Sequence, residues 1–216
     1  ESQLNRHSHI FTGGLTLTTS HVAAFMERLS DLLKGACFML TGGTLPPGMS
    51  ADSFGLFVRS ATLAGIPSLV DSFGQPMLLC LSARPAVVKM NRDEFKATFN
   101  LPCTSTADLQ SSAQQVFHHF NLPALVVTCG AEGLLACTPS GNLWARAPEQ
   151  VVVSAAGAGD AASGAIAWRL ALGESWPDVL RWAAAVSAAS VLTEGTSEVR
   201  LEDARALLPT VTIEPY

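Results

Sequence analysis

The sequence is poor in charged side chains. Only 14% of its 216 residues are charged, whereas 48% are apolar, and an average soluble domain has roughly 25% charged residues. Disordered chains need low hydrophobicity and high charge, so intrinsic disorder is excluded. Glycine (17) and proline (12) are close to ordinary usage, which excludes a collagen-like chain or a linker. A chain of this length can bury a large core, and we expect one domain over residues 1–216.

The sequence also lacks any run of lysine or arginine. Lys and Arg number 13 against 18 Asp and Glu, which gives a net charge of −5. Binding to nucleic acid or to an anionic membrane surface normally needs clustered basic residues, so we expect neither partner. No apolar stretch reaches the ~18 residues of a membrane span, and residues 1–7 lack the hydrophobic segment of a secretory signal. These absences favour a cytoplasmic protein.

Metal-binding and disulfide patterns are missing as well. The cysteines are Cys37, Cys80, Cys103, Cys129 and Cys137. They are odd in number and form no C-x-x-C pair, so we expect reduced thiols rather than a zinc site or a disulfide framework. The five histidines form no H-x-x-x-H or H-E-x-x-H pattern, which argues against a zinc hydrolase.

Short apolar segments alternate with segments of helical periodicity along the chain. Strands are predicted at Cys37–Thr41, Ile66–Asp71, Ala86–Met90, Ala124–Thr128, Gly133–Thr138, Asn142–Arg146 and Val151–Val153. Helices are predicted at Thr18–Lys34, Ser50–Ala64, from about Asn91, at Thr106–Phe120, Ala158–Leu172, Trp176–Leu192 and Leu201–Leu207. Continuous apolar strands that alternate with helices indicate an α/β fold, with a mostly parallel sheet covered on both faces.

The junction over residues 151–160 has the strongest functional signal. A predicted strand runs into a glycine loop, and an alanine-rich helix begins near Ala158. Free N–H groups and the dipole at a helix start make an anion site. Asp160, in the first turn, is kept ionised there, and a carboxylate beside a bound phosphate suits a base that takes a proton from a hydroxyl. A plain turn with Asp160 as a helix-start charge remains an alternative.

Residues 157–162 also fit the dinucleotide pattern G-x-G-x-x-G/A. That pattern requires a second strand about 20 residues on that ends in an acidic residue. The chain is instead predicted to be helical from Trp176 onward. We therefore rank the dinucleotide site below the anion site.

Three other strand ends carry unusual residues, and in open α/β sheets ligands bind beyond such ends. Asn91 and Glu94 are spaced to form a helix capping box, or to organise Mg²⁺ near phosphates. Residues 128–133 suit a hairpin turn or the edge of a nucleotide site. Residues 42–48 form a stiff connector, or a proline-rigid loop that holds Thr44 against a polar ligand.

Taken together and in this order, the four segments resemble the PfkB (ribokinase-like) carbohydrate kinases. Residues 157–160 are similar to the second signature of that family, 91–94 to its N-x-x-E motif and 128–133 to its nucleotide turn. Residues 44–48 and 71–74 resemble loops of its phosphosugar branch. The resemblance implies a three-layer α/β/α sandwich. It also implies that the chain is the C-terminal two-thirds of the kinase domain, without the N-terminal part and its β-lid.

The resemblance further implies transfer of a phosphoryl group from ATP to a hydroxyl of a fructose-phosphate or tagatose-phosphate type of substrate. Asp160 would be the base, and Gly157, Ala158 and Gly159 the anion hole. The implied ATP-binding residues are Lys89, Asn91, Thr128, Gly130, Gly133, Ser187 and Thr193. Thr44 and Asp160 would hold the sugar. Asn91 and Glu94 would hold Mg²⁺ indirectly, whereas Ser154 and Gly195 would contact K⁺. The full-length protein is expected to form a homodimer. A non-catalytic nucleotide-binding fragment or degenerate homologue remains the alternative.

The surplus of apolar residues gains an explanation from the implied truncation. Strand Cys37–Thr41 would normally be flanked by N-terminal strands. Without them a sheet edge and apolar faces would be exposed. We therefore expect these 216 residues alone to self-associate or to leave a large apolar patch.

Overall fold

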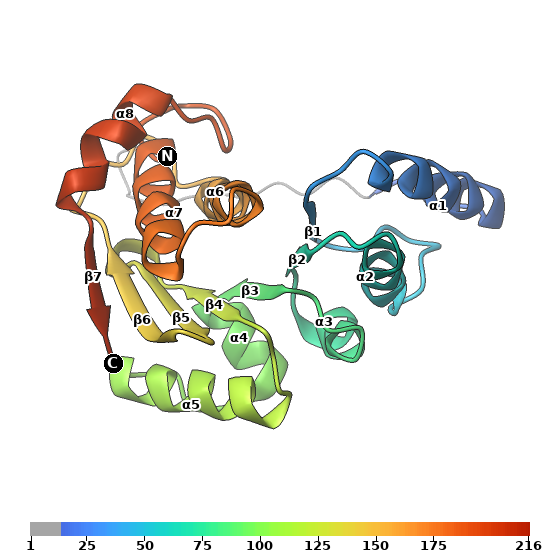
Figure 1. Cartoon of the computed structure of the whole chain (residues 1–216), viewed down its shortest axis with the longest axis horizontal. Coiled ribbons are helices and arrows are strands. Elements are labelled where there is room, and N and C mark those ends of the chain that lie inside the picture. The colour runs from blue at the N-terminus through green and yellow to red at the C-terminus, as the bar shows by residue number, and fades with distance from the viewer. Residues whose placement is uncertain (1–13) are drawn as a thin grey trace.

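The computed structural model describes residues 14–216 and contains one seven-stranded sheet (Figure 1). The strands lie side by side in chain order: β1 (Met39–Gly42), β2 (Ser68–Asp71), β3 (Val87–Asn91), β4 (Leu125–Thr128), β5 (Leu134–Thr138), β6 (Gly141–Arg146) and β7 (Thr212–Pro215). The pairings from β1 to β4 are parallel, and those from β4 to β7 are antiparallel. The carboxyl ends of β1 to β4 therefore meet at one edge of the sheet.

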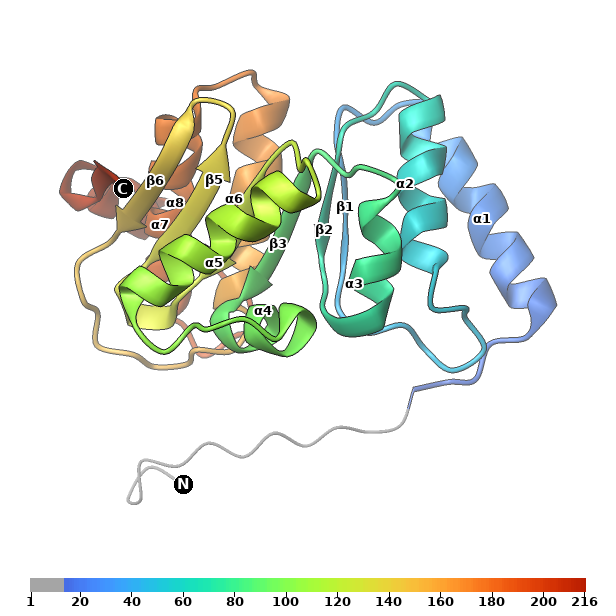
Figure 2. The same ribbon diagram turned by 90° about the horizontal axis from the view of Figure 1, so that it is seen from below.

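Helices cover both faces of the sheet (Figures 1 and 2). One side carries α2 (Ser53–Leu63), α3 (Gly74–Leu81), α4 (Arg92–Phe99) and α5 (Thr106–His119), with α1 (Thr19–Leu33) packed on α2. The other side carries α6 (Ala158–Ala171), α7 (Trp176–Ser190) and α8 (Leu201–Leu207). The three-layer α/β/α sandwich predicted from the sequence is confirmed.

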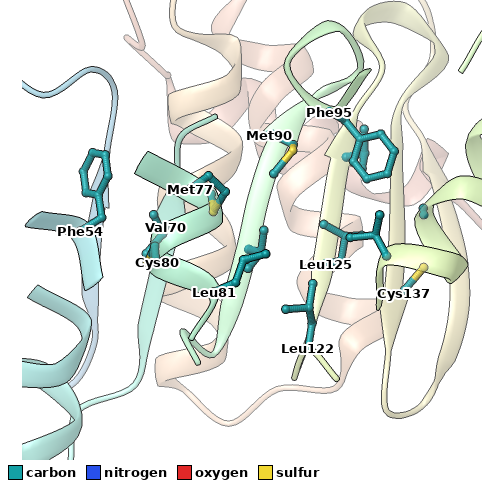
Figure 3. Packing of buried hydrophobic residues seen from close by; sticks show 14 of the residues in the cluster. Phe54, Val70, Met77, Cys80, Leu81, Met90, Phe95, Leu122, Leu125 and Cys137 are labelled. Carbon is teal, nitrogen blue, oxygen red and sulfur yellow. The ribbon is translucent and has the colours of Figure 1, made fainter. Parts of the chain in front are cut away.

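The alternation of side chains along the strands explains the two cores. Leu69 faces α6 and α7, whereas its neighbour Val70 packs on the opposite side, and both are fully buried. Figure 3 shows the larger cluster, where Met90 and Phe95 lie between the sheet and α4. On the other face, alanines make up most of the buried surfaces of α6 and α7. Such small side chains let the two helices pack closely against each other and the sheet.

The structure corrects three details of the predicted elements. Val151–Val153 is not a strand but an exposed loop. The edge beside β6 is already occupied by β7, and the N–H of Val153 bonds instead to the carbonyl of Val191 at 2.8 Å. The sequence pattern also missed α3 and β7. In the part of the chain that the structure describes, no helix is both long and apolar enough to cross a membrane.

Candidate active site

A cavity of about 830 Å³ opens at the carboxyl ends of the parallel strands. This volume is within the range of pockets that enclose small-molecule ligands. The strand ends contribute Asp71 of β2, Asn91 of β3 and Thr128 of β4, and the start of α6 forms another wall. The predicted site residues that line it are Thr44, Lys89, Asn91, Glu94, Thr128, Gly130, Gly133, Gly157, Ala158, Gly159, Asp160 and Ser187. The fold thus brings residues from all four junctions to one place.

The start of α6 presents unpaired N–H groups to this cavity. Gly157 precedes the helix with φ +80° and ψ 5°, a left-handed conformation that glycine adopts without strain. Within residues 14–216, the N–H groups of Gly157, Gly159 and Asp160 donate no hydrogen bond to the protein. A helix start with free donors is suited to an anion.

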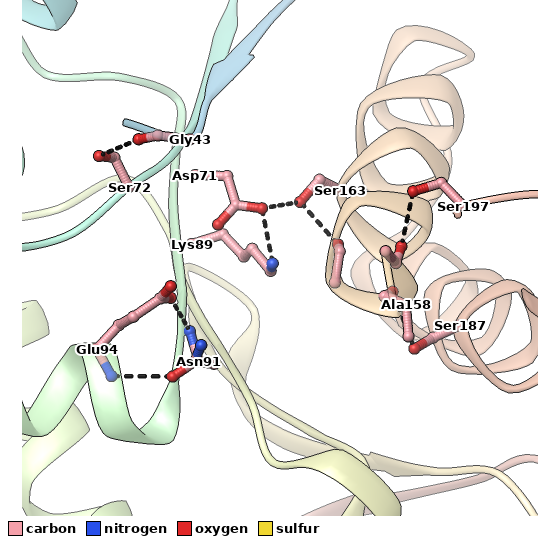
Figure 4. A network of polar contacts seen from close by, with 12 residues as sticks. Gly43, Asp71, Ser72, Lys89, Asn91, Glu94, Ala158, Ser163, Ser187 and Ser197 are labelled. Carbon is pink, nitrogen blue, oxygen red and sulfur yellow. Dashed lines mark hydrogen bonds and ion pairs between the residues drawn. The ribbon is translucent and has the colours of Figure 1, made fainter. Parts of the chain in front are cut away.

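Three serine hydroxyls lie close to the carbonyl groups of this same turn. Ser197 donates to Gly157 at 3.0 Å, Ser187 donates to Ala158 at 3.1 Å, and Ser163 lies 3.1 Å from the carbonyl oxygen of Gly159. Figure 4 shows these contacts around the first turn of α6. The hydrogen bonds from Ser197 and Ser187 fix the orientation of the carbonyl groups of Gly157 and Ala158, which reduces the rearrangement that anion binding requires.

Asp160 is solvent-exposed in the first turn of α6 and lines the cavity. The site therefore combines hydrogen-bond donors for an anion with a carboxylate that can accept a proton.

A buried ion pair lies beside the anion loop. Nζ of Lys89 is 2.7 Å from Oδ2 of Asp71, and Lys89 is 3% exposed. A Cβ added at Gly159 would lie 2.9 Å from that Nζ, so the ammonium group is next to the loop backbone. The hydroxyl of Ser163 is also 2.7 Å from Oδ2 of Asp71. The contacts of Asp71 and Ser163 with Lys89 were not predicted from the sequence. The signal that could have indicated them is a lysine in a buried strand, because a buried ammonium group needs a counter-charge.

Asn91 and Glu94 form the capping box that the sequence predicted as one alternative. The N–H of Glu94 donates to Oδ1 of Asn91 at 2.9 Å, and the N–H of Asn91 donates to Oε2 of Glu94 at 2.8 Å. Figure 4 shows these two hydrogen bonds. Both residues also line the cavity. The cap leaves the second carboxylate oxygen of Glu94 for another partner, so the role in Mg²⁺ binding stays a prediction.

The described residues are compatible with indirect Mg²⁺ binding. Residues 14–216 contain no group of three His, Cys, Asp or Glu side chains that could hold a metal by themselves. Mg²⁺ commonly binds through one or two carboxylates, with waters and substrate phosphates as the other ligands. Glu94, in the same cavity as the start of α6, suits that mode.

Residues 128–133 form the hairpin connection between β4 and β5, with a short 3-10 helix over Gly130–Glu132. Gly133 has φ +100°, and a Cβ there would collide with the carbonyl oxygen of Ala145. Thr128, Gly130 and Gly133 all line the cavity. The segment is therefore a hairpin turn and also a wall of the candidate site.

An ion pair fastens this turn to α4. Nη1 of Arg92 lies 2.7 Å from Oε1 of Glu132. The hydrogen bond from the Arg92 guanidinium holds the pKa of Glu132 below its usual range. The pair joins the wall from β4 to the wall from β3.

Three predicted site residues do not line the cavity. Thr193 is 6% exposed, and its hydroxyl contacts the carbonyls of Ser190 at 3.0 Å and Glu198 at 2.9 Å. Gly195 packs against the Glu198 side chain, and the Ser154 hydroxyl accepts the N–H of Ala156 at 3.4 Å. These residues lie in the turn after α7 and the loop before α6, beside the cavity wall.

Comparison with known proteins identifies the family of the chain. The model of the pfkB family of carbohydrate kinases matches residues 7–204. The chain belongs to this family. A curated relative, the 1-phosphofructokinase of Xanthomonas campestris, is 32% identical over 165 residues, 74% of this chain and 52% of that protein. The ATP-dependent 6-phosphofructokinase isozyme 2 of Escherichia coli K12 is 27% identical over 85% of this chain and 59% of its own length.

Solved structures show the same fold. Phosphofructokinase-2 from Escherichia coli, in complex with potassium, has a TM-score of 0.87 at 24% identity, over 96% of this chain and 67% of that one. Arabidopsis thaliana ribokinase, complexed with ribose and ATP, has a TM-score of 0.72 at 19% identity, over 84% of this chain and 58% of that one. The chain spans between 52% and 64% of the length of the first curated relatives that it matches.

Proposed function

We propose that this chain carries the ATP site and the catalytic base of a phosphosugar kinase. The observation that supports this most is that the free N–H groups at the start of α6 and the Asp160 carboxylate share one cavity. Family membership supplies the reaction class, because two of the relatives are named 1-phosphofructokinase and tagatose-6-phosphate kinase. The proposed acceptor is a hydroxyl of a fructose-phosphate or tagatose-phosphate type of sugar.

In the proposed reaction, Asp160 takes the proton of the acceptor hydroxyl. The hydroxyl oxygen forms a bond to the terminal phosphorus of ATP as the bond from that phosphorus to the bridging oxygen breaks, so that ADP leaves. The N–H groups of Gly157 and Gly159, which are free, and that of Ala158, which lies 3.4 Å from the carbonyl oxygen of Ala155, stabilise the charge on the transferring phosphoryl group. Catalysis by the chain is then mostly positioning and electrostatic stabilisation.

Other lining residues are assigned to the nucleotide and its metal. Lys89 supplies positive charge beside the loop, and Thr128 with Gly130 and Gly133 forms a wall for the nucleotide. Thr44 is proposed to contact the sugar. Glu94 would hold Mg²⁺, which when bound neutralises phosphate charge. K⁺ near Ser154 and Gly195 is proposed by analogy with the relative solved with potassium.

Substitution of Asp160 tests the proposal. ATP binding is measured by calorimetry, and ATP turnover is measured with a panel of fructose and tagatose phosphates. Asp160→Asn should lower turnover by about 10²- to 10⁴-fold, the usual contribution of a general base. ATP binding should persist, because the substitution removes a negative charge beside the anion site. Turnover that survives in Asp160→Asn would contradict the assignment of the base.

A matched control is Asp203→Asn, since Asp203 lies in the first turn of α8 and does not line the cavity. It should leave turnover unchanged. ATP binding without turnover in the unchanged chain would favour the non-catalytic alternative.

A further inference from the structure

We infer that Ser163 and Asp71 are positioning residues that hold the Lys89 ammonium group against the anion loop. Lys89 extends from β3, Asp71 ends β2, and Ser163 is on α6, so the contact joins three elements. The inference rests on the proposed function only in its last step, where Lys89 acts on the terminal phosphate. The contact itself is a property of the folded chain.

The three side chains form one polar cluster (Figure 4), in which Lys89 and Ser163 are buried and the Asp71 side chain is 13% exposed. Oδ2 of Asp71 lies 2.7 Å from Nζ of Lys89 and 2.7 Å from Oγ of Ser163. Lys89 is 3% exposed and Ser163 is 1% exposed. Groups so deeply buried are costly unless paired, so each member depends on the others for its partners.

The hydroxyl of Ser163 has one proton and two acceptors within reach. The carbonyl oxygen of Gly159 is 3.1 Å away, whereas the Asp71 carboxylate is 2.7 Å away and charged. Hydrogen bonds to an ionised acceptor are shorter and stronger, so the proton goes to Asp71. Ser163 thereby fixes the same carboxylate oxygen that fixes the lysine.

The consequence is a defined place for a positive charge. A Cβ on Gly159 would be 2.9 Å from Nζ of Lys89, which puts the ammonium group at the backbone of the anion loop. Ser163 does not line the cavity, so it acts through Asp71 and not on a ligand. Without its hydroxyl, the carboxylate loses one of its two anchors and the lysine is less strictly held.

Chemical labelling of lysines tests this arrangement without any nucleotide. The chain has only Lys34, Lys89 and Lys96, and the Lys34 side chain is 75% exposed, so it serves as an internal reference. With an amine-acylating reagent and mass spectrometry, Lys89 should react slowly in the unchanged chain. Ser163→Ala should raise the Lys89 rate about ten-fold, the equilibrium effect of losing a hydrogen bond to a charged group, with Lys34 unaffected.

Two further variants separate positioning from general loosening. Ser112→Ala removes another buried serine hydroxyl. Ser112 is on α5, away from the cavity, and its hydroxyl donates to the carbonyl of Pro102 at 2.7 Å. It should leave Lys89 labelling unchanged. In a chain that already carries Asp71→Asn, Ser163→Ala should change the Lys89 labelling rate little further, because Ser163 acts on Lys89 through the Asp71 carboxylate.

Nucleotide selectivity tests the last step. The ratio of ATP affinity to ADP affinity should fall several-fold in Ser163→Ala and stay unchanged in Ser112→Ala, since only ATP carries the terminal phosphate. A variant that is merely less stable would weaken both nucleotides alike, and that result would overturn the positioning role.

Labelling keeps the inference separate from the proposed function. If the unchanged chain binds no ATP, the proposed function fails while lysine labelling still decides whether Ser163 holds Lys89. If Ser163→Ala leaves Lys89 labelling unchanged, the inference is overturned whether or not nucleotide binds.

Discussion

The hydroxyl of Ser197 donates a 3.0 Å hydrogen bond to the carbonyl oxygen of Gly157, although the two residues are 40 positions apart. The N–H of Ser197 also donates to the carbonyl of Ala156 at 3.3 Å. The turn after α7 is therefore bonded to the loop that precedes α6. These bonds bring the turn after α7 close to Gly157, and they fix the peptide groups that face the cavity.

Replacing Gly157 by alanine should damage both stability and nucleotide binding. The residue has φ +80°, and a Cβ would lie 2.5 Å from the backbone nitrogen of Ser197. Strain of this kind costs on the order of 1–3 kcal/mol. We expect a lower urea midpoint and a loss of ATP affinity in calorimetry.

Gly164→Ala, inside the helix that Gly157 precedes, is the matched control. A Cβ at Gly164 meets nothing within 4 Å, so alanine should stabilise the helix by about 0.5–1 kcal/mol and leave ATP binding intact. If Gly157→Ala bound ATP as tightly as the unchanged chain, the loop would not be the anion site.

The sequence predicted those features of the fold and the site that depend on residues close together in the chain. Asn91 with Glu94, and the glycine loop before Asp160, could be recognised because caps and turns require particular residue types at fixed short spacings. The alternation of apolar strands and helices likewise predicted the layered sheet. The structure confirms the fold and the capping box, and it places these residues around one cavity.

Contacts between distant segments could not be predicted in the same way. Asp71 meets Lys89 across 18 positions and Ser163 across 92, and no local pattern records such pairings. The prediction of a strand at Val151–Val153 was wrong because an apolar run becomes a strand only where a sheet edge is free. β7 takes that edge, and its short sequence at the chain end shows no strand pattern.

Substitutions at Glu94 should separate its structural role from its role with Mg²⁺. Glutamine can replace glutamate in a capping box, so Glu94→Gln should change the urea midpoint little. The loss of charge should raise the Mg²⁺ concentration needed for half-maximal ATP binding several-fold. Calorimetric ATP titrations over a series of Mg²⁺ concentrations provide the measurement.

Asp108→Asn is the corresponding control, because Ser105 and Asp108 form the same box at the start of α5, outside the cavity. It should not alter the Mg²⁺ requirement. An unchanged Mg²⁺ requirement in Glu94→Gln would leave Glu94 with only its capping role.

The thiol of Cys129, next to Thr128 in the hairpin turn, should be unreactive at neutral pH. Burial raises the pKa of this thiol to about 11, despite the opposing effect of Arg92. A raised pKa favours the neutral thiol, and only the thiolate is alkylated. At pH 8, roughly one Cys129 thiol in a thousand is ionised. As long as the pH is below the pKa, each further pH unit raises the ionised fraction about ten-fold.

Alkylation with iodoacetamide, followed by mass spectrometry between pH 7 and 9.5, checks this expectation. The exposed Cys37 should react first, whereas Cys129 should become reactive only as the pH rises. Cys37→Ser should remove the fast phase. Labelling of Cys129 as fast as Cys37 at pH 8 would contradict the assigned burial.

The outer edge of β1 should make the isolated chain self-associate. Within residues 14–216, β1 pairs with β2 alone, and its Leu40 is 45% exposed. An open strand edge with apolar side chains invites pairing with another chain, and a lysine on such a strand opposes it. Leu40→Lys should therefore shift sedimentation-velocity profiles toward the monomer at a given concentration. Leu63→Lys, at a 90% exposed leucine on α2 rather than on the strand, should not. A monodisperse monomer of the unchanged chain across the concentration series would show that this edge is protected in solution.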